Sequence, residues 1–384
     1  MIYLDNAATT KPSSFVITNI KTITKEYFGN PSSLHSLGMK SEKAIREARE
    51  EISSALFVTP KEVYFNSSGT EGNNSVIFGL AGKKINKGKR IITTKVEHPS
   101  VLEPLKYLKE QGFDIVYLDV DENGLLKDEV TEFVTEDTFL VSIMQVNNET
   151  GAIFFVDDIS KGVKGINKNT YVHNDCIQGF LKIPSPREAD FITISSHKVG
   201  GLKGTGALVI KEKIPLLPLV YGGGQEKGFR SGTENVTGII AFDLSVKEGK
   251  NTFYNNRTQV QEMKEYLYKG FIEEVKDVKL NGLMDIDKFS PYIMNVSFLG
   301  AKAEVVLHIL EEKGIYVSTG SACSSNFKDK SHVLLSMGRS VEEVDSAIRF
   351  SFFQPLSLEK LDYVIEEVKR AVKGIRSKTL SVRG

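Results

Sequence analysis

The sequence lacks most features of a secreted, membrane-spanning or metal-binding protein. It has no tryptophan and only two cysteines and six histidines among 384 residues, so we expect neither a disulfide framework nor a metal centre. No apolar run reaches the ~18 residues of a membrane span. Residues 1–5 contain no basic stretch followed by an apolar one, as a secretory signal would. These absences predict a cytoplasmic protein in a reducing compartment, without a membrane partner.

An excess of either charge is also missing. Lys and Arg together number 49, as do Asp and Glu, so the formal net charge is zero. A nucleic-acid-binding protein would carry a basic face, and we therefore expect no nucleic-acid partner. A chain of this length can bury a large core and can divide into more than one domain.

The first 250 residues alternate between short apolar runs and segments of helical spacing. Helices are predicted at residues 41–57 and 101–111. Strands are predicted at 63–66, 91–94, 115–120, 139–146 and 191–194. Such alternation predicts an α/β fold with a mostly parallel sheet covered on both faces, and the carboxyl ends of its strands as the location of a site.

The remainder of the chain reads as a smaller α+β unit. A long helical pattern leads into it from residue 237 to residue 275. Strands are then expected near 278 and at 293–298, and helices at 303–313, at 341–350 and from 358 onward. We predict a large domain of residues 15–255 and a small domain made of residues 1–14 and 256–384.

Two residues that follow predicted strands suggest a pyridoxal phosphate site. Lys198 ends the sequence SSHK after the strand at 191–194 and precedes a glycine-rich segment. A lysine fixed in this way can form a Schiff base with an aldehyde cofactor. Asp175 follows another predicted strand and could hold the protonated pyridine nitrogen of that cofactor. A solvated lysine and a turn-forming aspartate are the alternatives.

Two further segments carry candidate chemistry. Residues 67–74 form a small-residue loop that opens a helix, where unpaired N–H groups and the helix dipole favour a phosphate; an ordinary helix cap is the alternative. Residues 318–331 are small and polar apart from Phe327, which predicts an exposed loop. The loop contains Cys323. An exposed free cysteine is prone to oxidation, so its presence here suggests a function; the alternative is a chance surface cysteine. Cys176 reads as a small buried residue.

Seven short motifs in one order identify a resemblance that covers nearly the whole chain. They are YLDNAATT at 3–10, GTEGNN at 69–74, EHPS at 97–100, NNETG at 147–151, SSHK at 195–198, RSGTEN at 230–235 and SACSS at 321–325. The chain resembles the NifS/IscS-type cysteine desulfurases of the class V aminotransferase family. The resemblance implies the aspartate-aminotransferase-like fold, called PLP type I, and pyridoxal 5'-phosphate as cofactor.

The resemblance also implies a role for each site residue. Lys198 would carry the cofactor, Asp175 would meet the ring nitrogen and Gln178 the phenolic oxygen, and His98 would stack on the ring and move protons. Asn147 would face both cofactor and substrate. The expected phosphate ligands are Thr70 with its preceding backbone, Ser195 and His197, and Gly69 and Glu71 are also expected to bind the cofactor. Thr233 would reach the phosphate bound by the other subunit. This contact implies a homodimer in which each site is completed by its partner.

The implied reaction converts L-cysteine to L-alanine. Arg349 would bind the substrate carboxylate, and the thiolate of Cys323 would take the sulfur as a persulfide. An iron–sulfur scaffold or another sulfur-acceptor protein would receive it, with Cys323 in transient contact with the scaffold's cluster site. A selenocysteine lyase or cysteine-sulfinate desulfinase on the same cofactor remains an alternative, as does a catalytically silent scaffold.

Overall fold

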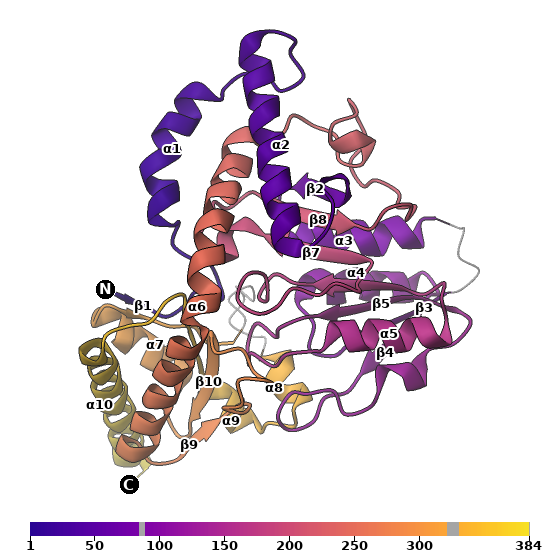
Figure 1. The fold of residues 1–384 in the computed structure, drawn as a ribbon. Coiled ribbons are helices and arrows are strands. Elements are labelled where there is room, and N and C mark those ends of the chain that lie inside the picture. Colours follow the sequence, from indigo (N-terminus) through magenta and orange to yellow (C-terminus); the bar gives the residue numbers. More distant parts are fainter. Residues whose placement is uncertain (84–88, 321–329, 384) are drawn as a thin grey trace.

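A computed structural model describes residues 1–83, 89–320 and 330–383. Its centre is a seven-stranded sheet in the order β2-β8-β7-β6-β5-β3-β4 (Figure 1). The strands are β2 (Val63–Asn66), β3 (Arg90–Thr94), β4 (Asp114–Leu118), β5 (Thr138–Met144), β6 (Tyr171–Asp175), β7 (Phe191–Ser195) and β8 (Gly206–Ile210). β8 runs antiparallel to both neighbours, whereas the other pairs between β3, β4, β5, β6 and β7 are parallel. The predicted α/β class with a mostly parallel sheet is confirmed.

Helices cover both faces of this sheet, and the side-chain alternation of the strands explains why. Ile91 packs in one hydrophobic cluster with α3 (Gly69–Ala81) and α4 (Pro99–Glu110). Its neighbour Ile92 packs in another with α2 (Ser36–Leu56), α5 (Val156–Ile166) and α6 (Val236–Glu274). Every residue of β5 and β7 is buried, which is why these strands read as nearly continuous apolar runs.

Three of the described α-helices were not predicted from the sequence: α5, a short helix at residues 332–336, and a helix that starts at residue 14. α1 (Ser14–Glu26) begins there, because the Ser13 side chain accepts the N–H of Val16 as an N-cap. Val16 and Ile23 form its buried face, and the helix packs against α6.

The 39-residue helix α6 connects the large sheet to a smaller layered unit, near which both chain termini lie (Figure 1). That unit contains an antiparallel sheet in the order β12-β10-β9 and a parallel pair, β1 with β11. Its strands are β1 (Ile2–Tyr3), β9 (Val278–Leu280), β10 (Ile293–Phe298), β11 (Ile315–Tyr316) and β12 (Ala347–Ser351). Its helices are α7 (Ala303–Glu312), α8 (His332–Ser336), α9 (Val341–Asp345) and α10 (Leu358–Arg383).

The helix predicted at residues 341–350 is wrong in its second half. α9 ends at Asp345, and β12 follows from Ala347, pairing antiparallel with β10 so that Asn295 faces Arg349. All five residues of β12 are buried. Pairing with a buried central strand therefore overrides the local helical spacing, and it places Arg349 on a rigid strand.

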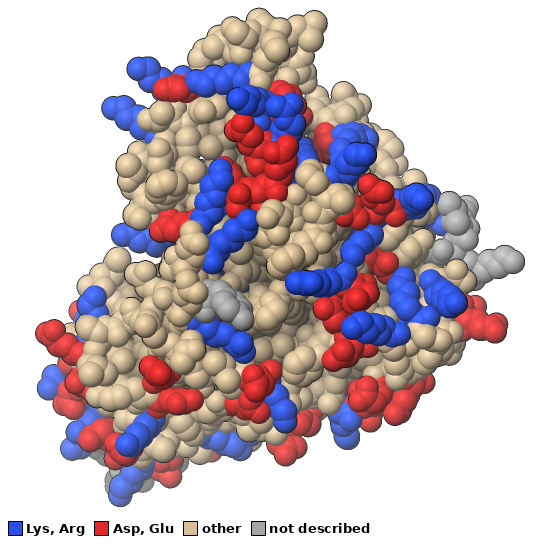
Figure 2. All heavy atoms as spheres, viewed as in Figure 1, with Lys and Arg blue, Asp and Glu red and all other residues tan. Residues whose placement is uncertain are grey.

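The surface carries both signs of charge. On the face shown in Figure 2, Lys and Arg lie beside Asp and Glu over most of the described chain. Among the helices that the structure describes, none is both long and apolar enough to cross a membrane.

Candidate active site

A cavity of about 180 Å³ opens beside the carboxyl ends of the central parallel strands. Asp175 ends β6, Ser195 ends β7 and His98 follows β3, as the rule for parallel sheets predicts. The cavity brings together nine of the residues named from the sequence. They are Gly69, Thr70, His98, Asp175, Gln178, Ser195, His197, Lys198 and Arg349.

Lys198 ends a single 3₁₀ turn (Ser196–Lys198) that directly follows β7. Its Nζ donates hydrogen bonds to the backbone oxygens of Ala7 at 2.6 Å and Ala8 at 2.8 Å. Gln178 Nε2 donates to the same Ala7 oxygen at 2.9 Å. The N-terminal segment thus forms one wall of the cavity and holds the amine against it.

Asp175 is a buried carboxylate at the floor of the cavity. Its Oδ2 accepts from Asn73 Nδ2 at 2.7 Å, and its Oδ1 accepts the N–H of Ile177 at 3.1 Å. Burial raises the pKa of Asp175, whereas these two hydrogen bonds and the charge of Lys198 act in the opposite direction. The surroundings therefore supply donors that favour the ionised form, which a protonated pyridine nitrogen would need.

His98 is the N-cap of α4, with Pro99 at the first helical position. Its Nδ1 accepts the Ser100 N–H at 3.1 Å and lies 2.8 Å from Ser100 Oγ. Burial, followed by the charges of Lys198 and His332, lowers the pKa of His98 to about 4. The imidazole is therefore neutral at physiological pH and can accept a proton.

One end of the cavity has the properties of an anion site. α3 begins at Gly69, and the cap at Ser68 uses its side chain on the Glu71 N–H. The positive end of this 13-residue helix therefore faces the cavity through Gly69 and Thr70. Ser195 Oγ, buried on the same cavity, has no hydrogen-bond partner within the described chain. Such an orphaned hydroxyl is costly unless a ligand satisfies it.

These groups fit pyridoxal 5'-phosphate. The cavity offers an amine at Lys198, a buried carboxylate at Asp175, a neutral imidazole at His98 and an anion site at α3. Gln178 also lines the cavity, and its Oε1 is a second buried atom without a partner in the described structure.

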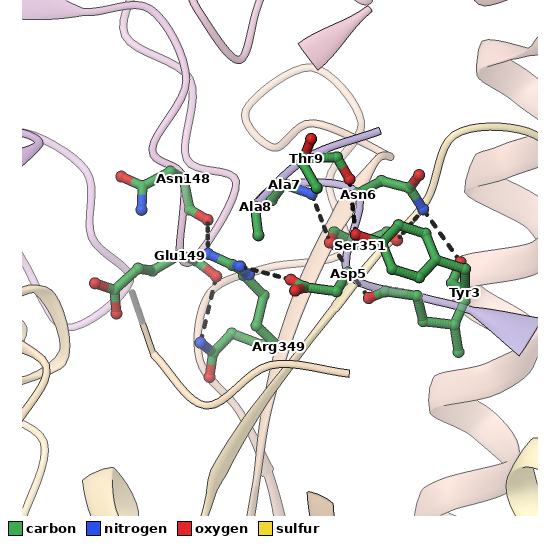
Figure 3. Close-up of polar contacts among 12 residues, drawn as sticks. Tyr3, Asp5, Asn6, Ala7, Ala8, Thr9, Asn148, Glu149, Arg349 and Ser351 are labelled. Carbon is green, nitrogen blue, oxygen red and sulfur yellow. Dashed lines mark hydrogen bonds and ion pairs between the residues drawn. The ribbon is translucent and has the colours of Figure 1, made fainter. Parts of the chain in front are cut away.

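Arg349 lies on β12 with its side chain 1% exposed. Its Nη1 donates to the Asn148 oxygen and its Nη2 to Asp5 Oδ1, both at 2.9 Å (Figure 3). Its Nε is buried and has no hydrogen-bond partner among the described residues. The guanidinium is thus held from two sides, and Nε is the one of its three nitrogens that has no hydrogen-bond partner among the described residues.

Three of the expected site residues do not line this cavity. The Asn147 side chain is turned into the protein, where its Nδ2 donates to the Val96 oxygen and its Oδ1 accepts two backbone N–H groups. Asn148 lines the cavity, and the role expected for Asn147 stays a prediction. Glu71 forms an ion pair with Arg230 at 2.9 Å.

Thr233 is the third of these, and the described lining of the cavity does not include it. Cys323 lies outside the described residues. Ser100, Asn73 and the carbonyl groups of Ala7 and Ala8 were missed from the sequence. The EHPS, GTEGNN and YLDNAATT motifs contain them, but no signal within those motifs singled them out.

Comparisons with known proteins identify the family of the chain. The model of the aminotransferase class-V family matches residues 2–364. A cysteine desulfurase IscS from Clostridium botulinum is 37% identical over 376 residues, which cover 97% of this chain and 94% of that protein. A solved NifS-like protein superposes with a TM-score of 0.90 at 34% identity, covering 97% of this chain and 99% of the other. The structure of SspA in complex with cysteine gives 0.81 at 30% identity, covering 93% and 100%.

The fold and the cavity are those of a pyridoxal-phosphate-dependent enzyme. More particularly, the chain belongs to the aminotransferase class-V family, in its group of NifS/IscS-type cysteine desulfurases.

Proposed function

We propose that this protein is a cysteine desulfurase that converts L-cysteine to L-alanine and retains the sulfur as a persulfide on Cys323. The observation that carries this proposal is the juxtaposition of Lys198, Asp175 and Arg349 around one cavity. The amine and the buried carboxylate can bind an aldehyde cofactor. The guanidinium, whose Nε has no partner among the described residues, can bind the carboxylate of an amino acid. The solved SspA complex holds cysteine on the same fold.

Asp175 would hold the ring nitrogen of pyridoxal phosphate, the N-terminus of α3 and Ser195 its phosphate, and Lys198 its aldehyde carbon. The bound cofactor supplies an electron sink that makes proton loss and carbon–sulfur cleavage feasible at the substrate. Arg349 orients the substrate through its carboxylate. Neutral His98 and Lys198 Nζ are the groups positioned to take up and return protons.

Sulfur transfer balances without an external oxidant. The carbon–sulfur bond of cysteine breaks, a sulfur–sulfur bond to Cys323 forms, and the carbon gains a proton to give alanine. Only a thiolate is nucleophilic enough for this step. Cys176 cannot substitute, because burial raises the pKa of its thiol and it lies within the core.

The wider role follows from the IscS relatives and from the RSGTEN motif. The persulfide would supply an iron–sulfur scaffold or another acceptor protein in the cytoplasm. Thr233 would complete the site of the partner subunit in a homodimer. Residues 15–255 would form the cofactor-binding domain, and residues 1–14 with 256–384 the domain that carries Cys323.

The test is incubation with L-cysteine and a thiol reductant, with alanine and sulfide measured together. Equal amounts of both products are expected from the unaltered protein and from Cys176→Ala, whereas Cys323→Ala should release neither. A selenocysteine lyase or sulfinate desulfinase would instead retain most turnover of its own substrate in Cys323→Ala. Alanine production by Lys198→Ala at the rate of the unaltered protein would refute the proposal.

A further inference from the structure

A chain of hydrogen bonds joins two titratable side chains that line the cavity, Asp175 and His98. Asn73 Nδ2 donates to Asp175 Oδ2 at 2.7 Å and to Ser100 Oγ at 2.9 Å. Ser100 Oγ lies 2.8 Å from His98 Nδ1. Asn73 and Asp175 are buried, with exposures of 0% and 5%, so these contacts are protected from competition by water.

The donor of each hydrogen bond in this chain follows from which partner groups can donate and which can only accept. The Asn73 amide must turn its NH₂ group toward Asp175, because the alternative orientation would set its carbonyl oxygen against a carboxylate. The same NH₂ group then donates to Ser100 Oγ, which leaves the Ser100 hydroxyl hydrogen for His98 Nδ1. The Ser100 N–H also points to Nδ1 and can only donate. The imidazole proton is therefore placed on Nε2.

Asn73 gives up a hydrogen bond to hold this arrangement. Its Oδ1 is buried without a partner in the described structure, and a native protein rarely leaves a buried amide oxygen unpaired. A side chain that served only to pack the α3–α4 contact could be apolar at lower cost. An apolar residue at this position could donate a hydrogen bond to neither Asp175 nor Ser100.

We propose that Asn73 is a positioning residue that couples Asp175 to His98 through Ser100. It directs the Asp175 carboxylate as an acceptor toward the cavity, and it commits the Ser100 hydroxyl to His98 so that Nδ1 remains an acceptor and Nε2 carries the proton. This inference deepens the proposed function, because both end residues flank the expected cofactor. Asn73 itself does not line the cavity.

The groups that face His98 in the described structure set the background for a test. Lys198 approaches from the turn after β7 and His332 from α8, and both disfavour a charged imidazole. Hydrogen bonds donated to Nδ1 add to that effect, because they stabilise the neutral form. Loss of the Ser100 donor should therefore make His98 easier to protonate, while Lys198 and His332 remain in place.

The experiment compares Asn73→Ala and Ser100→Ala with the control Asn74→Ala. Asn74 is the next residue of α3, and among the described residues its amide donates to backbone oxygens alone, those of Thr70 and Ser100. Imidazole ¹⁵N shifts of the full chain, freed of cofactor, are followed against pH, and His98→Gln assigns the signal. Thermal unfolding of each variant checks that it remains folded.

We expect the His98 midpoint to rise by about 1 pH unit in Asn73→Ala and Ser100→Ala and to stay unchanged in Asn74→Ala. The dissociation constant of pyridoxal phosphate should rise about tenfold in reconstituted Asn73→Ala, because the Asp175 carboxylate loses a donor that orients it. Equal midpoints in all three variants would overturn the inference. If Asn73→Ala does not fold, Ser100→Ala decides alone. None of these readouts depends on sulfur transfer, so they can fail while the proposed function stands.

Discussion

Replacing Arg349 with lysine tests how the substrate would be held. The guanidinium has five N–H donors, of which one donates to the Asn148 oxygen and one to Asp5 Oδ1, both at 2.9 Å. Its buried Nε has no partner among the described residues, and Arg349 lines the cavity, so we expect this donor to meet the substrate carboxylate. An ammonium group concentrates its donors at one point and cannot reach all three acceptors. Losing a hydrogen bond between charged groups costs about 1.5–3 kcal/mol, so kcat/KM for L-cysteine should fall roughly 10- to 150-fold.

The assay is the initial rate of alanine formation over a range of L-cysteine concentrations. Most of the loss should be in KM, with kcat within about threefold of the unaltered protein, because the interaction is present before and during reaction. Arg370→Lys is the matched control, since Arg370 is 65% exposed and its ion pairs within the described chain are with glutamates on its own helix. A fall in kcat with unchanged KM would show that Arg349 does not bind the substrate carboxylate.

Three further predictions concern the scaffold around the site. Glu226→Gln should lower the free energy of unfolding in urea by about 3–5 kcal/mol, because Glu226 forms a two-point ion pair with Arg49 at 2.7 Å and accepts the Phe65 N–H; an unchanged midpoint would contradict this. His173 is buried, and burial lowers its pKa from 6.5 to about 3. Between these two pH values the imidazole binds a proton in the unfolded chain but not in the folded one. The free energy of unfolding should therefore fall by up to about 1.4 kcal/mol per pH unit as the pH drops from 6.5 toward 3. His173→Gln should flatten that slope, and an equal slope would refute the assignment. Burial raises the pKa of Cys176, so one thiol should react with a disulfide reagent only after denaturation; two fast thiols in the native protein would contradict it.

The large sheet could be predicted from the sequence because burial on both faces leaves a simple signature. The strand predicted at 191–194 became β7, and the strand predicted at 293–298 matches β10. Residues 341–350 failed because their identity as helix or strand depends on β10, which lies about 50 residues earlier in the chain. No local pattern contains that partner.

Parts of the site could be predicted where residue type and position after a strand together suggest a chemical role, as for Lys198 and Asp175. The sequence analysis named Asn147, whereas of these two adjacent asparagines Asn148 is the one that lines the cavity. The turn decides between them, because Asn147 Oδ1 accepts the N–H groups of Glu149 and Thr150 and is thereby committed to the backbone. The Asn73–Ser100 contact was equally hidden, since only the packing of α3 on α4 brings the two together.

The N-terminal segment shows most clearly what a sequence conceals, because its contribution is made largely by backbone atoms. Asp5 holds Arg349 of β12, and the Ala7 N–H donates to Ser351 on the same strand (Figure 3). The Ala7 oxygen then accepts from Lys198, which follows the large sheet. One short segment thereby fixes the distance between the amine and the guanidinium, although they belong to different sheets. A substrate held at its carboxylate by Arg349 and at its amino group near Lys198 would depend on that link, so alanines without functional side chains become part of the recognition of an amino acid.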